Sequence, residues 1–205
     1  MQLPHARIDL PELTGPLRDP TSWLTWLADA FSCTPQRFDH LHEVWQRAIE
    51  LRRLELAELE PEMSDRLELA ALLHDVGRAL DPGNTEPHGF VGARFLDELG
   101  LDDIAPLVAH HSGARVEAAQ RGMADRDRWI TAEPDLLAVL TFLDRTTSPT
   151  GERVLLAQRR DDIAARYGTG SPQVQRFDAT LADVRRAERL LAPMPPKFEG
   201  DPSGH

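Results

Sequence analysis

Residues 67–78 read Leu67-Glu68-Leu69-Ala70-Ala71-Leu72-Leu73-His74-Asp75-Val76-Gly77-Arg78. The pattern predicts an apolar helix that ends in the adjacent His74-Asp75 pair and is then stopped by Gly77. A neutral imidazole and a carboxylate are the ligands that divalent ions such as zinc, iron and manganese accept in proteins. Six of the eight histidines fall between positions 40 and 111. The stretch therefore predicts a scaffold for a metal site.

The overall composition is that of a globular protein. Hydrophobic residues make up 41% of the 205 residues and charged residues 28%, which is enough for one well-buried core. We expect a Pro-rich extended arm over 1–20, a single domain over 21–192 and a disordered tail over 193–205. No segment reaches the roughly 18 apolar residues of a membrane span, and no signal-peptide pattern opens the chain. The expected location is the cytoplasm, without a membrane partner.

Charge and cysteine content limit which metal ligands and which partners the protein can have. Cys33 is the only cysteine, so a metal would have to be held by histidine and aspartate. The formal net charge of −11 repels a phosphate backbone, which argues against nucleic acid as a partner. A small phosphorylated substrate drawn into a local positive site stays compatible with that charge. Nothing in the sequence indicates an oligomeric state.

Helical periodicity and the positions of proline and glycine predict an all-α protein of about seven to eight helices. The expected helices cover about 21–32, 35–60, 64–75, 88–99, 104–111, 134–144, 152–167 and 173–192. Ser64 and Asp102 are the expected N-caps of the third and fifth helices. Residues 79–87 are expected to form a loop, and residues 113–131 a helical turn or a mobile cover.

Two further polar residues stand at positions where a metal ligand is plausible. His40 lies one turn before Val44, on or beside the apolar face of its helix, although a lone inward histidine is more often a satisfied core residue. His42 is displaced by about 200° around the same helix and is expected to face solvent. Asp144 ends an apolar helix, where its charge opposes the helix dipole, so a cationic partner or a metal is expected.

Four features then follow one another in a fixed order. They are His40, then His74-Asp75 within Leu-Leu-His-Asp-Val-Gly-Arg, then His88 and the pair His110-His111, and finally Asp144 within Phe-Leu-Asp-Arg-Thr-Thr-Ser-Pro-Thr-Gly. From about residue 38 to 150 the chain resembles the HD superfamily of metal-dependent phosphohydrolases, which is named for this His, His-Asp, Asp signature. The resemblance implies a helical bundle of the HD-domain type.

The resemblance also implies a ligand set. His40, His74, Asp75 and Asp144 would hold one divalent ion. His88 with His110 or His111 would hold a second ion, and Asp75 would bridge the two. On a helix His110 and His111 point about 100° apart; His111 is the preferred ligand and His110 the outer hydrogen-bond donor. Iron, manganese, zinc or magnesium, as one or two ions, would suit these donors.

Arginine side chains are expected to neutralise the negative charge of the substrate's phosphoryl oxygens. Many catalytic relatives have lysine where this chain has Arg78, which can pair with phosphate oxygens but cannot donate a proton near neutral pH. We expect Asp75 and Arg78 to act in catalysis. Arg78, Arg115 and Arg145 are the expected contacts of the phosphoryl oxygens.

Three function classes remain open. The leading hypothesis is a hydrolase that acts on a phosphoester or phosphoanhydride of a small nucleotide through metal-activated water. The second is a non-catalytic HD module that binds a nucleotide or a protein. The third is a di-iron oxygenase on the same scaffold. Cyclic-dinucleotide phosphodiesterases of the family carry a Gly-Tyr-Pro signature after the paired histidines, where this chain has Ser112-Gly113-Ala114-Arg115, so that substrate is disfavoured.

Overall fold

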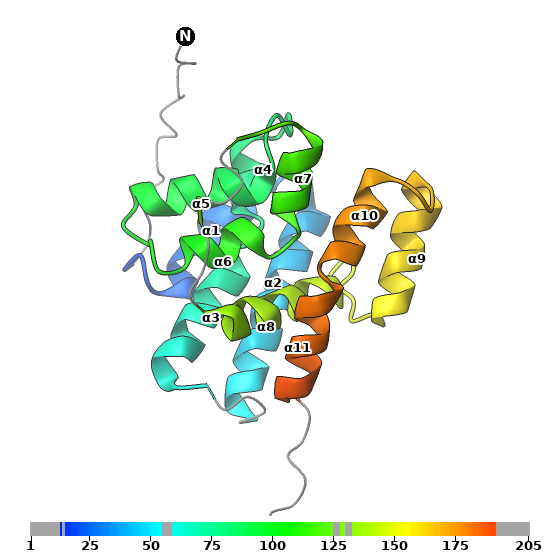
Figure 1. Cartoon of the computed structure of the whole chain (residues 1–205). Coiled ribbons are helices and arrows are strands. Elements are labelled where there is room, and N and C mark those ends of the chain that lie inside the picture. Colours follow the sequence, from blue (N-terminus) through cyan, green and yellow to red (C-terminus); the bar gives the residue numbers. More distant parts are fainter. Residues whose placement is uncertain (1–12, 14, 55–58, 125–127, 130–132, 192–205) are drawn as a thin grey trace, which may run out of the picture.

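The structure, a computed structural model, describes residues 13, 15–54, 59–124, 128–129 and 133–191 (Figure 1). Within these residues eleven α-helices and one short 3-10 helix account for the regular structure, and no strand is present. Thr147 and Arg153 form an isolated antiparallel bridge. The prediction of an all-α fold is confirmed.

The elements follow one another along the chain with short connections. They are η1 Pro20–Trp23, α1 Leu24–Ala30, α2 Pro35–Arg53, α3 Pro61–Leu73, α4 Val76–Leu80, α5 His88–Glu98, α6 Ala105–His110, α7 Ala114–Gln120, α8 Pro134–Arg145, α9 Leu156–Tyr167, α10 Pro172–Ala179 and α11 Leu181–Leu191.

The described residues hold more α-helices than the seven to eight that the sequence predicts, because predicted helices are interrupted. The helix through His74-Asp75 breaks at that pair and resumes as α4, so Gly77 and the predicted loop residues 79 and 80 are helical. The predicted helix 173–192 breaks at Thr180, whose hydroxyl donates to the Phe177 carbonyl at 2.8 Å. Within 113–131 the expected helical turn exists as α7.

Several predicted helix starts and ends are wrong by a few residues. Helix α2 ends at Arg53 rather than near residue 60. Pro61 was expected to stop that helix and instead opens α3, since a proline at the first helical position loses no hydrogen bond. Ser64 therefore lies one turn inside α3 and is not its N-cap. Likewise α6 has Ile104 rather than Asp102 at its N-cap position, and α9 begins at Leu156.

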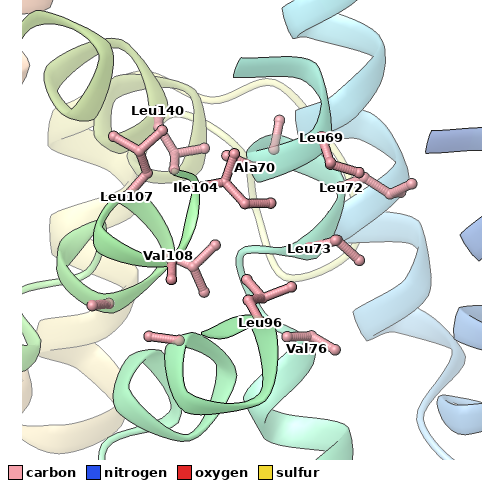
Figure 2. Close-up of a cluster of buried hydrophobic side chains, with 14 of the residues drawn as sticks. Leu69, Ala70, Leu72, Leu73, Val76, Leu96, Ile104, Leu107, Val108 and Leu140 are labelled. Atoms are coloured by element: carbon pink, nitrogen blue, oxygen red, sulfur yellow. The ribbon is translucent and has the colours of Figure 1, made fainter. Parts of the chain in front are cut away.

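The main core lies where α3, α4, α5, α6 and α8 meet. Figure 2 shows side chains from these helices turned toward one another, among them Leu72, Leu96, Ile104 and Leu140. Each of these four has 0% of its surface exposed. Burying a leucine or isoleucine side chain stabilises a fold by about 1.5–3 kcal/mol relative to leaving it exposed. The core therefore fixes the helices that carry the histidines.

Glycines let α4, α5 and α6 approach one another closely. A Cβ atom placed on Gly77 of α4 would lie 1.9 Å from the carbonyl oxygen of His88, and one on Gly89 of α5 would lie 2.5 Å from the carbonyl oxygen of Ala109. Both distances are far inside van der Waals contact, and both neighbours are backbone atoms. Only glycine permits these two crossings, which bring the segments bearing Asp75, His88 and His111 together.

Helices α9 and α10 form a pair beside the main bundle (Figure 1). They share a small core of their own, with Ile163, Val174 and Phe177 buried between them. Helix α10 also contacts α7 and α11. The pair thus lies next to the segment that carries Ser112 and α7, which becomes important for the site.

The predicted arm and tail fall mostly outside the described residues, which exclude 1–12, 14 and 192–205. Residues 15–19 of the arm contain no helix, and η1 begins at Pro20. Within the described residues, no helix combines the length and the apolar character that crossing a membrane requires.

Candidate metal centre

The helix break at His74-Asp75 creates the centre. Helix α3 ends at Leu73, and Asp75 has φ −100° and ψ 9°, outside the helical range, before α4 starts at Val76. His74 is 0% exposed and Asp75 3%. A buried carboxylate is stable only with close partners, and the structure surrounds this one with histidine and arginine.

One group of donors lies between α2, the break and the end of α8. The Nε2 atom of His40 is 3.2 Å from Nε2 of His74 and 3.1 Å from Oδ1 of Asp144. Nε2 of His74 is 3.8 Å from the same oxygen of Asp144. Ligand atoms of His40, His74 and Asp75 all lie within 4.8 Å of one another. These four residues are the set that the sequence predicts for a first ion.

A second group adjoins the first on the other side of Asp75. Oδ1 of Asp75 is 3.0 Å from Nε2 of His88 and 3.9 Å from Nε2 of His111. The two imidazole nitrogens are 3.3 Å apart. Asp75 is thus shared by both groups, which is the geometry expected of a bridging carboxylate.

Backbone hydrogen bonds fix the protonation of three of the rings. Nδ1 of His40, His74 and His111 each lies within 2.9 Å of a carbonyl oxygen, and a carbonyl can only accept, so Nδ1 carries the proton. The acceptors are, in order, the carbonyls of Ser148, Ala71 and Val108. In the neutral rings the Nε2 lone pairs of His40 and His74 then face each other across 3.2 Å with no proton between them. A cation satisfies such a pair, and a hydrogen bond does not.

The ionisation states also suit a metal. Burial opposes ionisation of Asp75, but the charge of Arg78 and the hydrogen bond with His88 outweigh it and hold the pKa of Asp75 well below its ordinary value. Burial likewise opposes ionisation of Asp144, whereas the positive charge of the neighbouring Arg145 holds its pKa well below the ordinary value. The carboxylates are therefore charged at neutral pH.

Three buried histidines of the donor groups are neutral at the same pH, because burial lowers the pKa values of His74, His88 and His111. Neutral imidazoles and ionised carboxylates are the forms in which these side chains bind metal ions. Nitrogen and carboxylate donors without thiolate fit zinc, iron or manganese, and the single cysteine, Cys33, is exposed elsewhere. The donors present thus fit a divalent metal.

Arg78 and Arg37 lie beside the shared carboxylate. Nε of Arg78 is 2.8 Å from Oδ2 of Asp75, and its Nη2 is 3.4 Å from Nε2 of His88. Nη1 of Arg37 is 3.7 Å from the same Oδ2. Arg37 lies three residues before His40 on α2, on the same face of the helix, and that spacing could have identified it from the sequence.

The structure does not bring every predicted residue to the centre. His110 belongs to neither donor group; its ring packs edge-on against Phe90, with ring centroids 5.7 Å apart. Arg115 is exposed and lines a different cavity together with His110. His42, predicted to face solvent, is half-buried and stacks against Phe38. Of the expected phosphate contacts, Arg78 and Arg145 do lie at the centre.

A cleft of about 220 Å³ opens onto the second donor group, with His88, Arg78 and Arg145 in its lining. Helices α9 and α10 contribute Arg159, Arg166, Tyr167 and Arg176 to the same cleft. None of these four residues was predicted from the sequence to belong to the site. Their spacing on two surface helices is that of an ordinary solvated face, and only the packing of α9 and α10 beside the centre gives them a role.

The match to a family model decides the family. The model for the HD domain matches residues 37–148, which include both donor groups. The chain belongs to the HD domain family. The resemblance seen in the sequence is thereby confirmed, and a metal centre with hydrolytic chemistry is the general character of HD domains.

The relatives do not define the activity of this HD protein. An uncharacterized protein of Methanocaldococcus jannaschii is 36% identical over 114 residues, which is 53% of this chain and 64% of that protein. The match thus spans less than two thirds of that relative's length. No solved structure matches the chain.

Proposed function

We propose that this HD protein is a metal-dependent phosphohydrolase that acts on a small phosphorylated substrate, a nucleotide. The observation that carries the proposal is the pair of donor groups that share Asp75 beside an arginine-lined cleft, whose lining includes His88. Two adjacent ion positions under a positive cleft suit a phosphoryl group, which needs charge neutralisation and an activated water.

The donor groups support a particular choice of ligands. His40, His74, Asp75 and Asp144 would hold one divalent ion, and Asp75, His88 and His111 a second. Such ions, when bound, lower the pKa of a coordinated water and stabilise charge on phosphoryl oxygens. The carbonyl bonds to Nδ1 keep His40, His74 and His111 oriented for this task, and buried Asp75 stays ionised between the two positions.

Arg78 and Arg37 would bind the phosphoryl oxygens. Both lie within 4 Å of Asp75 and both line the cleft, so a phosphoryl group over the centre would meet two guanidinium groups. Arginine stays charged at neutral pH, so Arg78 stabilises charge and does not donate the proton. In the reaction, the attacking water releases a proton to solvent as its oxygen bonds to phosphorus, the P–O bond to the leaving oxygen breaks, and that oxygen takes up a proton from solvent.

Metal content and hydrolysis, measured together, test the proposal. Protein purified without chelator or affinity metal should contain about two equivalents of iron, manganese or zinc by elemental analysis. It should release phosphate from nucleotides in the presence of the metal found. Asp75→Asn should lose metal and hydrolysis while its circular dichroism stays helical, and Asp29→Asn, an exposed carboxylate on α1, should match the wild type.

Other outcomes would contradict the proposal. Protein that holds no metal and takes up none on addition would be a binding module. Protein that holds iron, releases no phosphate and forms an oxygen-dependent product would be an oxygenase.

A further inference from the structure

Several residues that line the cleft come from a part of the chain that the family match does not include. That match ends at residue 148, whereas α9 and α10 span residues 156–179. They place three arginines, Arg159, Arg166 and Arg176, in the lining of the cleft. Both donor groups lie within the residues that match the HD domain, whereas this arginine wall, formed by Arg159, Arg166 and Arg176, lies outside them.

Positive charge is crowded in the cleft to an unusual degree. Six arginines line it, against one carboxylate, Glu117, among the described lining residues. The six are Arg37, Arg78, Arg145, Arg159, Arg166 and Arg176. The whole chain carries a formal charge of −11, so the cleft opposes the overall charge of the protein. A concentration of one charge in a concave site attracts a ligand of the opposite charge.

The arginines of the wall have few carboxylates to neutralise them. Arg159 and Arg166 share Asp162, at 3.2 Å and 2.5 Å, and the side chain of Asp162 is 47% exposed. Arg176 pairs with Glu117 at 2.5 Å, and Glu117 also pairs with Arg121 outside the cleft lining. Asp75 and Asp144 belong to the donor groups for metal. The wall therefore retains excess positive charge.

Arg159 shows the strongest sign of a missing partner. Its side chain is only 11% exposed, and its Nε atom is buried without a hydrogen-bond partner among the described residues. A buried donor left unpaired costs about 1–3 kcal/mol.

We propose that Arg159 and Arg166, with Arg176, bind phosphate groups beyond the one that is hydrolysed, so that the substrate is a nucleotide with a phosphoanhydride chain. This inference rests on the proposed hydrolase function. Arg78 and Arg37 serve a phosphoryl group at the metal centre, and the wall provides three further guanidinium groups for the rest of the chain. Charge-assisted pairs of arginine with phosphate are among the stronger hydrogen bonds in proteins.

The size and rim of the cleft agree with this ligand. A volume of about 220 Å³ is smaller than the roughly 300–1,000 Å³ of pockets that enclose whole drug-sized ligands. The cleft therefore takes the phosphate chain and leaves the nucleoside at its open rim. Tyr167, at that rim, is 53% exposed and presents an aromatic ring to an attached base.

Binding to metal-free protein tests the arginine wall without relying on activity. Inorganic tripolyphosphate and orthophosphate are titrated by calorimetry into chelator-treated wild type, Arg159→Gln, Arg166→Gln and Arg185→Gln. Arg185 is exposed on α11, outside the cleft lining, and is the matched control. Arg176 is left in place because its loss would leave the buried carboxylate of Glu117 with one arginine partner, Arg121, in place of two.

Wild type should bind tripolyphosphate at least about tenfold more tightly than orthophosphate, since several guanidinium groups contact the longer anion. Each wall variant should lose most of that preference, and Arg185→Gln should keep it. Equal affinity of the wild type for the two anions would overturn the proposal. A preference that survives in both wall variants would do the same. Circular dichroism of each variant shows whether it is folded.

Hydrolysis then separates the two proposals. With the metal found in the purified protein, ATP and ADP should have a higher kcat/KM than AMP, and Arg159→Gln should raise KM for ATP at least about fivefold with kcat little changed. Hydrolysis of all three nucleotides with equal kcat/KM would refute phosphate binding by the arginine wall but would support the proposed hydrolase function. Tight tripolyphosphate binding without hydrolysis of any nucleotide would support phosphate binding by the arginine wall and refute the proposed hydrolase function.

Discussion

Replacing Gly77 with alanine tests whether the close crossing of α4 and α5 holds the metal centre together. A Cβ atom at this position would lie 1.9 Å from the His88 carbonyl oxygen and 2.7 Å from the Gly92 nitrogen, both of which are backbone atoms. Ordinary contact begins near 3.4 Å. The two helices must therefore separate by about 1.5 Å, since neither neighbour can rotate away.

That separation affects the site more than the fold. Asp75 lies just before α4 and His88 opens α5, and their ligand atoms are 3.0 Å apart. A shift of about 1.5 Å exceeds by far the tolerance of about 0.2 Å for metal–ligand distances, so the second donor group is lost. Overpacking costs about 1–3 kcal/mol, and the better helix propensity of alanine returns up to about 1 kcal/mol. The expected net loss in unfolding free energy is about 1–2 kcal/mol.

Urea unfolding with chelator present and elemental analysis without it measure the two effects. Gly77→Ala should unfold at a lower urea concentration than the wild type and hold about one equivalent less metal. The control is Gly170→Ala, because a Cβ atom there has nothing within 4 Å, and this variant should match the wild type in both assays. If Gly77→Ala keeps the full metal content and the wild-type midpoint, the reasoning about the α4–α5 crossing is wrong.

Three further predictions follow from the same geometry. His111→Asn should lower the metal content by about one equivalent, whereas His110→Asn should leave it unchanged, because only His111 lies near Asp75; elemental analysis of both variants decides. Arg47 donates to the Leu143 carbonyl and to the Thr147 hydroxyl at the end of α8, and burial lowers its pKa to about 10, so it stays charged at pH 7. Arg47→Met should therefore cost about 1–3 kcal/mol in urea unfolding, and wild-type stability in that variant would contradict this role. The metal-free protein should lose stability as the pH falls below 6.5, because His74, His88 and His111 have lowered pKa values when folded and take up protons more readily when unfolded. Stability should fall again below pH 3.8, because Asp75 and Asp144 have lowered pKa values when folded and take up protons more readily when unfolded. Urea midpoints measured across pH with chelator present would reveal both losses.

The sequence alone determined the helical class and most members of the two donor groups. Hydrophobic spacing identifies helices because a buried face repeats every 3.6 residues whatever the rest of the chain does. His40, His74, Asp75, His88 and Asp144 were identified from residue types and from the resemblance to the HD superfamily, and the structure brings them together. Metal chemistry needs particular donor atoms, so residue type carries much of that information.

Tertiary structure decided what depends on direction and on distant contacts. The helix predicted to end near Asp75 breaks there, and Gly77 packs closely on α5. Together these two features place Asp75 in both donor groups. The orientation of α6 brings His111, and not His110, into a donor group. The packing of α9 and α10 brings Arg159 and Arg166 into the cleft, whereas Arg115 lines another cavity. Charge and periodicity are local properties of a chain, whereas a site is defined by which surfaces meet, and only folding of the whole chain settles that.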